Sequence, residues 1–157
     1  MDTTEHFLRD FSQQAMSAIP MLQSMELSFS EFNDHCLRVD MPLAPNVHDK
    51  NTGFGGSIAA LATTAGWAVV SLILRRLPRH YHVLVAESHI RYLSPATANC
   101  YALASVTDSA KSAFINVLQE HHSGRITIQS VVEQDGKQVA VFTGTYKVQL
   151  AGSLCQW

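Results

Sequence analysis

The stretch "APNVHDKNTGFGGSIAALATTAGWAVV", residues 44–70, passes from a polar, turn-rich loop through a glycine pair into a long apolar run. The run continues to about Arg76 and is stopped by Pro78, so it predicts one long helix from about Gly56. At about 100° per residue, apolar side chains cover nearly the whole circumference of this helix. Such a helix has to be enclosed by other elements, and the surrounding strands are the available enclosure.

One narrow stripe of the helix carries small side chains only. It consists of Ser57, Ala60, Thr64, Ala68 and Ser71. We expect this stripe to face the enclosing sheet, because small side chains let a helix and a sheet approach closely.

The rest of the chain alternates between polar and apolar residues and predicts an antiparallel sheet. Expected elements are a helix at 4–18, a hairpin turned at 33–35 with its second strand at 36–41, strands at 81–93 and 100–107, and strands near 125–133 and 138–149. Residues 109–119 fit either a short helix or a prolonged strand. Asp135-Gly136 predicts a type I′ hairpin turn. The predicted fold class is α+β.

Length, charge and cysteine content favour a single-domain cytoplasmic protein that binds neither nucleic acid nor membranes. The 157 residues suit a single domain, 1–157, and the net charge of −2 with scattered Lys and Arg argues against nucleic acid as a partner. Residues 58–74 fall short of the roughly 20 apolar residues of a membrane span, so no membrane association is expected. The three cysteines, Cys36, Cys100 and Cys155, show no paired spacing and indicate free thiols in the cytoplasm.

A central helix held by a curved antiparallel sheet is the hotdog architecture. On "APN", "NTGFGGSIAAL" and "GW", the chain resembles the YiiD C-terminal-type thioesterase domain of the hotdog-fold superfamily. The stretches "IRYLSPA" (90–96) and "VAVFTGTYKV" (139–148) are similar to the third and last strands of that superfamily. The resemblance implies a cytoplasmic homodimer or dimer of dimers with acyl-thioester sites at the dimer interface. The implied substrate is an acyl-CoA or an acyl carrier protein (acyl-ACP), with no cofactor beyond the coenzyme A of the substrate.

The N-terminus of the predicted long helix can bind a negatively charged oxygen. A helix N-terminus presents unpaired backbone N–H groups that can hold a developing oxyanion. Gly55 and Gly56 would let a substrate approach that backbone, and Ser57 would cap the helix or bind the ligand. The alternative is that Gly-Gly-Ser only makes the turn and the cap.

Hydrolysis also needs a group that activates water, and the preceding loop offers several. Asp49 is the first candidate for a general base or nucleophile and His48 the second, while Asn46 and Asn51 would orient the thioester or the water. Further residues are assigned to substrate binding: Phe54, Thr64, His89 and Arg91. The alternative is that the loop Asn and Asp residues form local turns and that the His is merely solvated.

The chain departs from the thioesterase pattern at the helix. Many hotdog thioesterases carry an acid seven residues after the second glycine of a His-Gly-Gly entrance; here that position is Thr63, and Phe54 replaces the His. The Thr63 hydroxyl remains to position water. Asn51 and Gly53 also stand where the YiiD pattern has Gly and Ala. The sequence therefore favours an acyl-thioester hydrolase and leaves open a non-catalytic acyl-ligand-binding or dimerisation module.

The remaining polar residues are considered as ligands of a metal ion or of the phosphate groups of coenzyme A. His80 and His82 share a strand face but lack a third ligand at a metal-site spacing, so no metal is expected. Arginines of the helix end and the next strand would meet the nucleotide phosphates of coenzyme A: Arg75, Arg76, Arg79 or Arg91.

Overall fold

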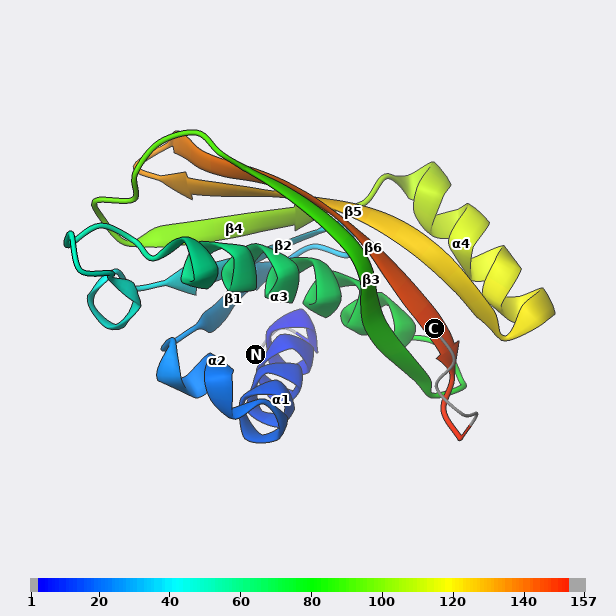
Figure 1. Cartoon of the computed structure of the whole chain (residues 1–157). Helices are drawn as coiled ribbons and strands as arrows, with labels where there is room; N and C mark the ends of the chain where they lie inside the picture. Colours follow the sequence, from blue (N-terminus) through cyan, green and yellow to red (C-terminus); the bar gives the residue numbers. More distant parts are fainter. Residues whose placement is uncertain (1–2, 153–157) are drawn as a thin grey trace.

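The helix α3 (Gly55–Leu74) runs along the inside of a curved sheet in the computed structural model, which describes residues 3–152 (Figure 1). The other elements are α1 (Thr3–Ala18), α2 (Pro20–Ser24), β1 (Ser28–Phe32), β2 (Cys36–Met41), the 3₁₀ turn η1 (Ala44–Asn46), β3 (Tyr81–Tyr92), β4 (Cys100–Ser105), α4 (Asp108–His121), β5 (Ser123–Gln134) and β6 (Lys137–Leu150). In Figure 1 the sheet arches over α3, while α1 and α2 lie on the other side of the helix. This is the predicted α+β hotdog arrangement.

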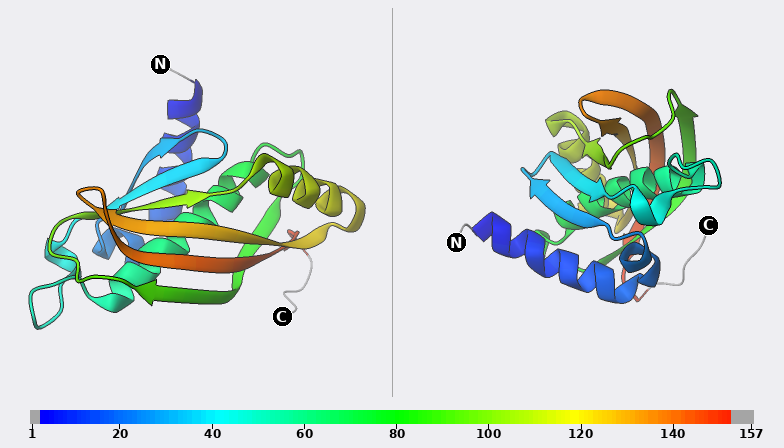
Figure 2. Two further views of the ribbon diagram at one scale, coloured as in Figure 1. Left: turned by 90° about the horizontal axis from the view of Figure 1, so that it is seen from above. Right: turned by 90° about the vertical axis from the view of Figure 1, so that its left-hand side faces the viewer.

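The sheet has six antiparallel strands in the order β1-β2-β4-β5-β6-β3. Figure 2 shows the long strands β5, β6 and β3 side by side. The β5–β6 turn has positive φ at both Asp135 (48°) and Gly136 (75°), which confirms the hairpin prediction. Residues 109–119 are helical, within α4. The strands β1 and β3 form the two edges of the sheet, so no other strand among residues 3–152 pairs with the outer side of β3.

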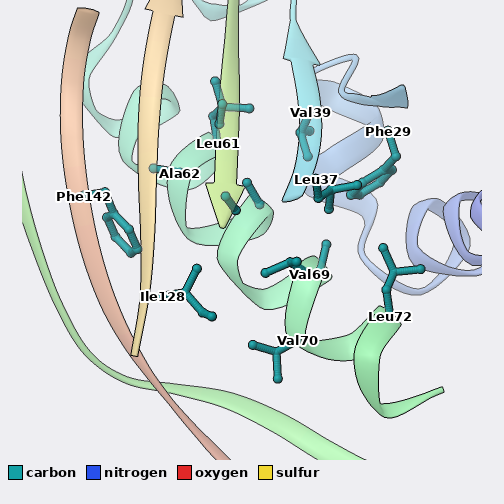
Figure 3. Packing of buried hydrophobic residues seen from close by; sticks show 14 of the residues in the cluster. Phe29, Leu37, Val39, Leu61, Ala62, Val69, Val70, Leu72, Ile128 and Phe142 are labelled. Atoms are coloured by element: carbon teal, nitrogen blue, oxygen red, sulfur yellow. The ribbon is translucent and has the colours of Figure 1, made fainter. Parts of the chain in front are cut away.

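The core lies between α3 and the inner face of the sheet. Side chains alternate between the two faces of each strand, and the inward ones are apolar, such as Leu37, Val39 and Ile128 (Figure 3). They pack against the helix residues Leu61 and Val69. Because burying one such side chain stabilises the fold by roughly 1.5–3 kcal/mol, this face of α3 contributes heavily to folding.

The predicted stripe of small residues does not face the sheet as a whole. Ala68 is buried, but Ser57, Ala60, Thr64 and Ser71 are only partly buried. The small residues that meet the sheet are instead Ala62, Ala65 and Gly66. The prediction of the facing side was wrong because a helix that is apolar nearly all round has no strong preference for one side.

Two side chains of the sheet donate hydrogen bonds to backbone carbonyls in the middle of α3. The Tyr146 hydroxyl donates to the Thr63 carbonyl at 2.8 Å, and the Ser130 hydroxyl donates to the Ala62 carbonyl at 3.2 Å. Gly66 makes room for the tyrosine, because a Cβ at this position would lie 2.8 Å from Cζ of Tyr146 and closer still to its oxygen. Burial raises the pKa of the Tyr146 phenol, and the nearby backbone N–H of Trp67 opposes this to a smaller extent.

By length and composition α3 could cross a membrane, with a mean hydropathy of 1.9, but 72% of that window is buried inside the fold. The helix is therefore the core helix of this architecture. Cys36 and Cys100 are free thiols, and Cys155 lies outside the described residues.

Replacing Gly66 by Ala tests the contact between α3 and Tyr146. Helix propensity alone would stabilise the variant by about 1 kcal/mol. We expect instead a net loss of about 1–3 kcal/mol in the free energy of unfolding, since the new methyl group overpacks the tyrosine. Urea denaturation measures this loss. The double variant Gly66→Ala/Tyr146→Phe should recover part of it, and a Gly66→Ala protein more stable than the parent would contradict the contact.

Candidate functional site

The polar loop before α3 folds back on itself. An isolated bridge joins Val47 to Gly53, the His48 N–H donates to the Thr52 carbonyl at 3.0 Å, and the Asn51 N–H donates to the His48 carbonyl at 3.0 Å. Asn51 has a φ of 60°, in the left-handed region that glycine and asparagine adopt most readily. The loop is thus a closed turn that carries His48 toward the start of the helix.

Hydrogen bonds fix this loop to the rest of the fold. The Phe54 N–H donates to the Asn46 carbonyl and the Gly53 N–H to the Ala96 carbonyl, both at 2.7 Å. Asn46 is 2% exposed, and its side-chain amide donates to the carbonyls of Met25 (2.9 Å) and Pro42 (2.8 Å). Both amide hydrogens of Asn46 therefore hold backbone segments together, and its predicted role toward a thioester stays a prediction.

The entrance of α3 has backbone donors without helical acceptors. Phe54 is the N-cap residue and its side chain makes no capping bond, while the first helical bond runs from the Ile58 N–H to the Phe54 carbonyl at 3.0 Å. The N–H groups of Gly55, Gly56 and Ser57 precede that bond. Ser57 thus lies inside the first turn and is not the cap.

Two aromatic rings flank the entrance. The Tyr92 hydroxyl donates to the Gly55 carbonyl at 2.9 Å, and the Phe54 ring packs over Gly56 while Phe54 as a whole remains 53% exposed. A groove of about 400 Å³ opens here, and its walls include His48, Thr52, Gly55 and Tyr92. Such a volume is in the range of small-molecule sites.

His48 is the best-placed titratable side chain of the groove. Its Nε2 lies 2.7 Å from the Thr52 hydroxyl, and its Nδ1 lies 3.0 Å from both the Lys50 N–H and a carboxylate oxygen of Asp49. One ring nitrogen cannot accept and donate at once, so the two Nδ1 contacts belong to different protonation states. The His48 side chain is 27% exposed and that of Asp49 is 87% exposed. The Asp49 carboxylate therefore lies nearer the solvent than the His48 imidazole. The imidazole lies between this carboxylate on one side and the Thr52 hydroxyl on the other.

Thr63 and Thr64 lie apart from the entrance. They line a second, mainly apolar cavity of about 280 Å³ between α2, α3 and Val85 of β3. Eight helical residues, about 12 Å, separate Thr63 from Gly55. The Thr63 hydroxyl donates its hydrogen to the Ala59 carbonyl at 2.8 Å, so only the lone pairs of its oxygen are left for a further hydrogen bond.

The remaining predicted residues are not brought together with this site. His89 and Arg91 pair with Thr143 and Val141 of β6 and point to the outer face of the sheet. Strict alternation from Tyr81 would place them on the inner face, but a bulge between Val85 and Glu87 reverses the alternation. Asn51 is exposed at the loop tip.

Sequence reasoning missed two residues of the groove, Thr52 and Tyr92. Thr52 stands four residues after His48 in a loop too polar to single it out. Tyr92 lies within the "IRYLSPA" stretch, but its contact with Gly55 depends on the reversed alternation of β3. Among residues 3–152, no three His, Cys, Asp or Glu side chains converge as a metal site would require.

Comparison with known proteins gives the same family over nearly the whole chain. The sequence model of the family described as "Putative thioesterase (yiiD_Cterm)" matches residues 8–150. The solved structure of the "putative thioesterase" from Shewanella oneidensis is similar at 30% identity and a TM-score of 0.84, with 92% of this chain and 99% of that chain covered.

Two more distant structures share the fold. A protein of unknown function from Chlorobaculum tepidum has 22% identity and a TM-score of 0.86, covering 92% of this chain and 95% of its own. A thioesterase from Haemophilus influenzae has 17% identity and a TM-score of 0.75, covering 95% of this chain and 94% of its own.

Replacing Asn46 by Asp tests whether this side chain holds the loop. Aspartate has the same size but no hydrogen to donate, so it would face two carbonyl oxygens with a negative charge. We expect a loss of about 2–4 kcal/mol in the free energy of unfolding without any substrate present. Thermal and urea unfolding measure it. Unchanged stability would show that the amide is free to serve a ligand instead.

Proposed function

The chain belongs to the "Putative thioesterase (yiiD_Cterm)" family, and on that premise we propose that it hydrolyses the acyl thioester of an acyl-CoA or acyl-ACP at the α3 entrance. The proposed enzyme is a cytoplasmic homodimer or dimer of dimers, without a metal. The observation that carries the proposal is that one groove is lined both by the His48 imidazole and by Gly55, whose backbone N–H has no helical acceptor. Acyl transfer to water needs both an oxyanion site and a base.

The proposed reaction uses His48 as the base. Asp49 accepts the Nδ1 hydrogen of His48, and Nε2 takes a proton from water at the place where it now meets Thr52. The water oxygen attacks the thioester carbonyl carbon, and the carbonyl electron pair moves to oxygen. The N–H groups of Gly55 and Gly56 hold that oxyanion. Its collapse breaks the C–S bond, and the sulfur leaves with the proton from His48, giving a carboxylic acid and a thiol.

The free edge of β3 supports the dimer. Unpaired strand edges recruit further strands, and exposed apolar side chains follow this one: Val85, Tyr92 and Leu93, with Phe54 beside them. If two β3 edges pair antiparallel about a two-fold axis, the first residues of one strand lie beside the last residues of the other. The α3 entrance of one subunit would then face the open side of α3 in the other, where Thr63 and Thr64 lie.

A non-catalytic acyl-binding module is the second candidate. The observation that favours it is Thr63, which stands where related thioesterases have an acid and whose hydroxyl donates its hydrogen to Ala59. Turnover separates the two functions, because such a module would bind acyl-CoA without hydrolysing it.

An assay of thioester hydrolysis over short, medium and long acyl chains tests the reaction. With His48→Gln, kcat/KM should fall by about 10²–10⁴-fold, because the general base is removed. Asp49→Asn should cause a smaller loss, since it only orients the imidazole. The matched control is His121→Gln, an exposed histidine at the end of α4, which should keep full activity.

The relative size of the two losses identifies the base. A larger loss for Asp49→Asn than for His48→Gln would assign that role to the carboxylate. Acyl-CoA binding without hydrolysis by the parent protein would favour the non-catalytic module.

The dimer is tested at Val85, which is 39% exposed on β3. Val85→Lys should shift the protein toward the monomer in sedimentation experiments, because Val85 faces the open side of α3 beside β3 and the proposed partner subunit would bury the new charge there. Val117 on α4 is 42% exposed, and Val117→Lys is the matched control that should leave the oligomeric state unchanged. A dimer that tolerates Val85→Lys would place the interface elsewhere.

A further inference from the structure

Tyr92 makes a hydrogen bond that the folding of α3 does not require. Its hydroxyl donates to the Gly55 carbonyl at 2.9 Å, although Tyr92 is 52% exposed. The N-terminus of a helix leaves backbone N–H groups unpaired, whereas the carbonyls of its first turn already accept from the next turn. Water can solvate an exposed hydroxyl equally well. The bond from Tyr92 is therefore an addition to a carbonyl that the helix itself already satisfies.

The sheet holds Tyr92 in place at the α3 entrance. Tyr92 is the last residue of β3 and pairs with Ala140 of β6, and the next N–H, that of Leu93, donates to the Val139 carbonyl at 2.8 Å. The bulge of β3 turns the tyrosine toward the inner face of the sheet. Its ring then lies against Gly55, where a Cβ would be 3.6 Å from Cζ of the tyrosine. The direction of the hydroxyl is thus set by a regular strand and not by a loop.

The carbonyl that Tyr92 binds belongs to the same peptide group as the N–H of Gly56. This group is planar, and its C=O and N–H point in opposite directions. A donor at the oxygen draws electron density from the nitrogen, so the N–H at the other end becomes a stronger donor, as in any chain of hydrogen bonds. Gly56 is exposed, and its N–H precedes the first helical hydrogen bond of α3. The strengthened N–H is therefore available to a ligand.

We propose that Tyr92 is a positioning residue, which orients the Gly55–Gly56 peptide group and strengthens the Gly56 N–H as a donor to the oxyanion. The assignment rests on the proposed thioesterase function and deepens it. Tyr92 and Gly55 line the same groove as His48. A negatively charged oxygen gains more from a polarised donor than the neutral carbonyl of the bound substrate does. Tyr92 would thus lower the barrier of the reaction without tightening the binding of the substrate.

Steady-state kinetics of Tyr92→Phe test this role, because the variant loses the hydroxyl and keeps the ring. We expect kcat to fall about 3–20-fold, less than the roughly 10²–10³-fold that loss of a whole oxyanion donor costs, since the Gly56 N–H remains. KM and the thermal unfolding temperature should stay nearly unchanged.

Tyr101→Phe is the matched control for this measurement. The Tyr101 hydroxyl also makes a hydrogen bond, to Glu133 at 2.7 Å, but it lies on the outer face of the sheet. This variant should keep the kcat of the parent. A Tyr92→Phe protein with parental kcat, or one whose KM rises as much as its kcat falls, would overturn the assignment.

Nuclear magnetic resonance of the isotope-labelled full chain, without substrate, separates this proposal from the proposed function. Tyr92→Phe should move the amide nitrogen and proton resonances of Gly56 upfield, because electron density returns to the N–H when the carbonyl loses its donor. Tyr101→Phe should leave both resonances in place. Unmoved Gly56 resonances in Tyr92→Phe would overturn the assignment. If the parent protein hydrolyses no thioester, the proposed function fails, and these resonances alone decide whether Tyr92 governs the Gly56 N–H.

Discussion

Two hydroxyl groups of the sheet, those of Tyr146 and Ser130, donate to consecutive backbone carbonyls in the middle of α3. With Gly66 they fix which side of an almost uniformly apolar helix meets the sheet. The opposite side, which carries Thr63 and Thr64, is thereby turned toward α2 and the free edge of β3. The position of every cavity described above follows from this one orientation, because α3 contributes to the wall of each.

In the proposed site, the groups that would take part in the reaction differ from the side chain that fixes the loop in place. The donors proposed for the oxyanion belong to the backbone at Gly55 and Gly56, and the buried amide of Asn46 anchors the loop beside them. Only His48 and Asp49 would supply titratable groups. A thioesterase can therefore lack an acid on the central helix if the preceding loop supplies the base. Here the loop would supply it through the His48 imidazole and the Asp49 carboxylate.

Much of the fold could be predicted because its signals are local. The apolar run of α3, the Asp135-Gly136 turn and the alternation of the long strands each reside in a short window. The orientation of α3 could not be predicted, because its apolar surface is continuous. For the site, the loop and the helix entrance were predictable, but the burial of Asn46 and the outward direction of His89 depend on distant partners and on a bulge that no residue type announces.

The bond between Tyr146 and Thr63 spans 83 residues of sequence. During synthesis α3, the most hydrophobic segment of the protein, is therefore made before β5 and β6. These two strands bury part of its surface in the folded protein. Non-local closure of this kind slows folding, and uncovered apolar surface invites aggregation meanwhile. The elements that precede α3 in the chain, namely α1, α2 and the β1–β2 hairpin, are the parts of the fold that are available to cover the helix during this interval.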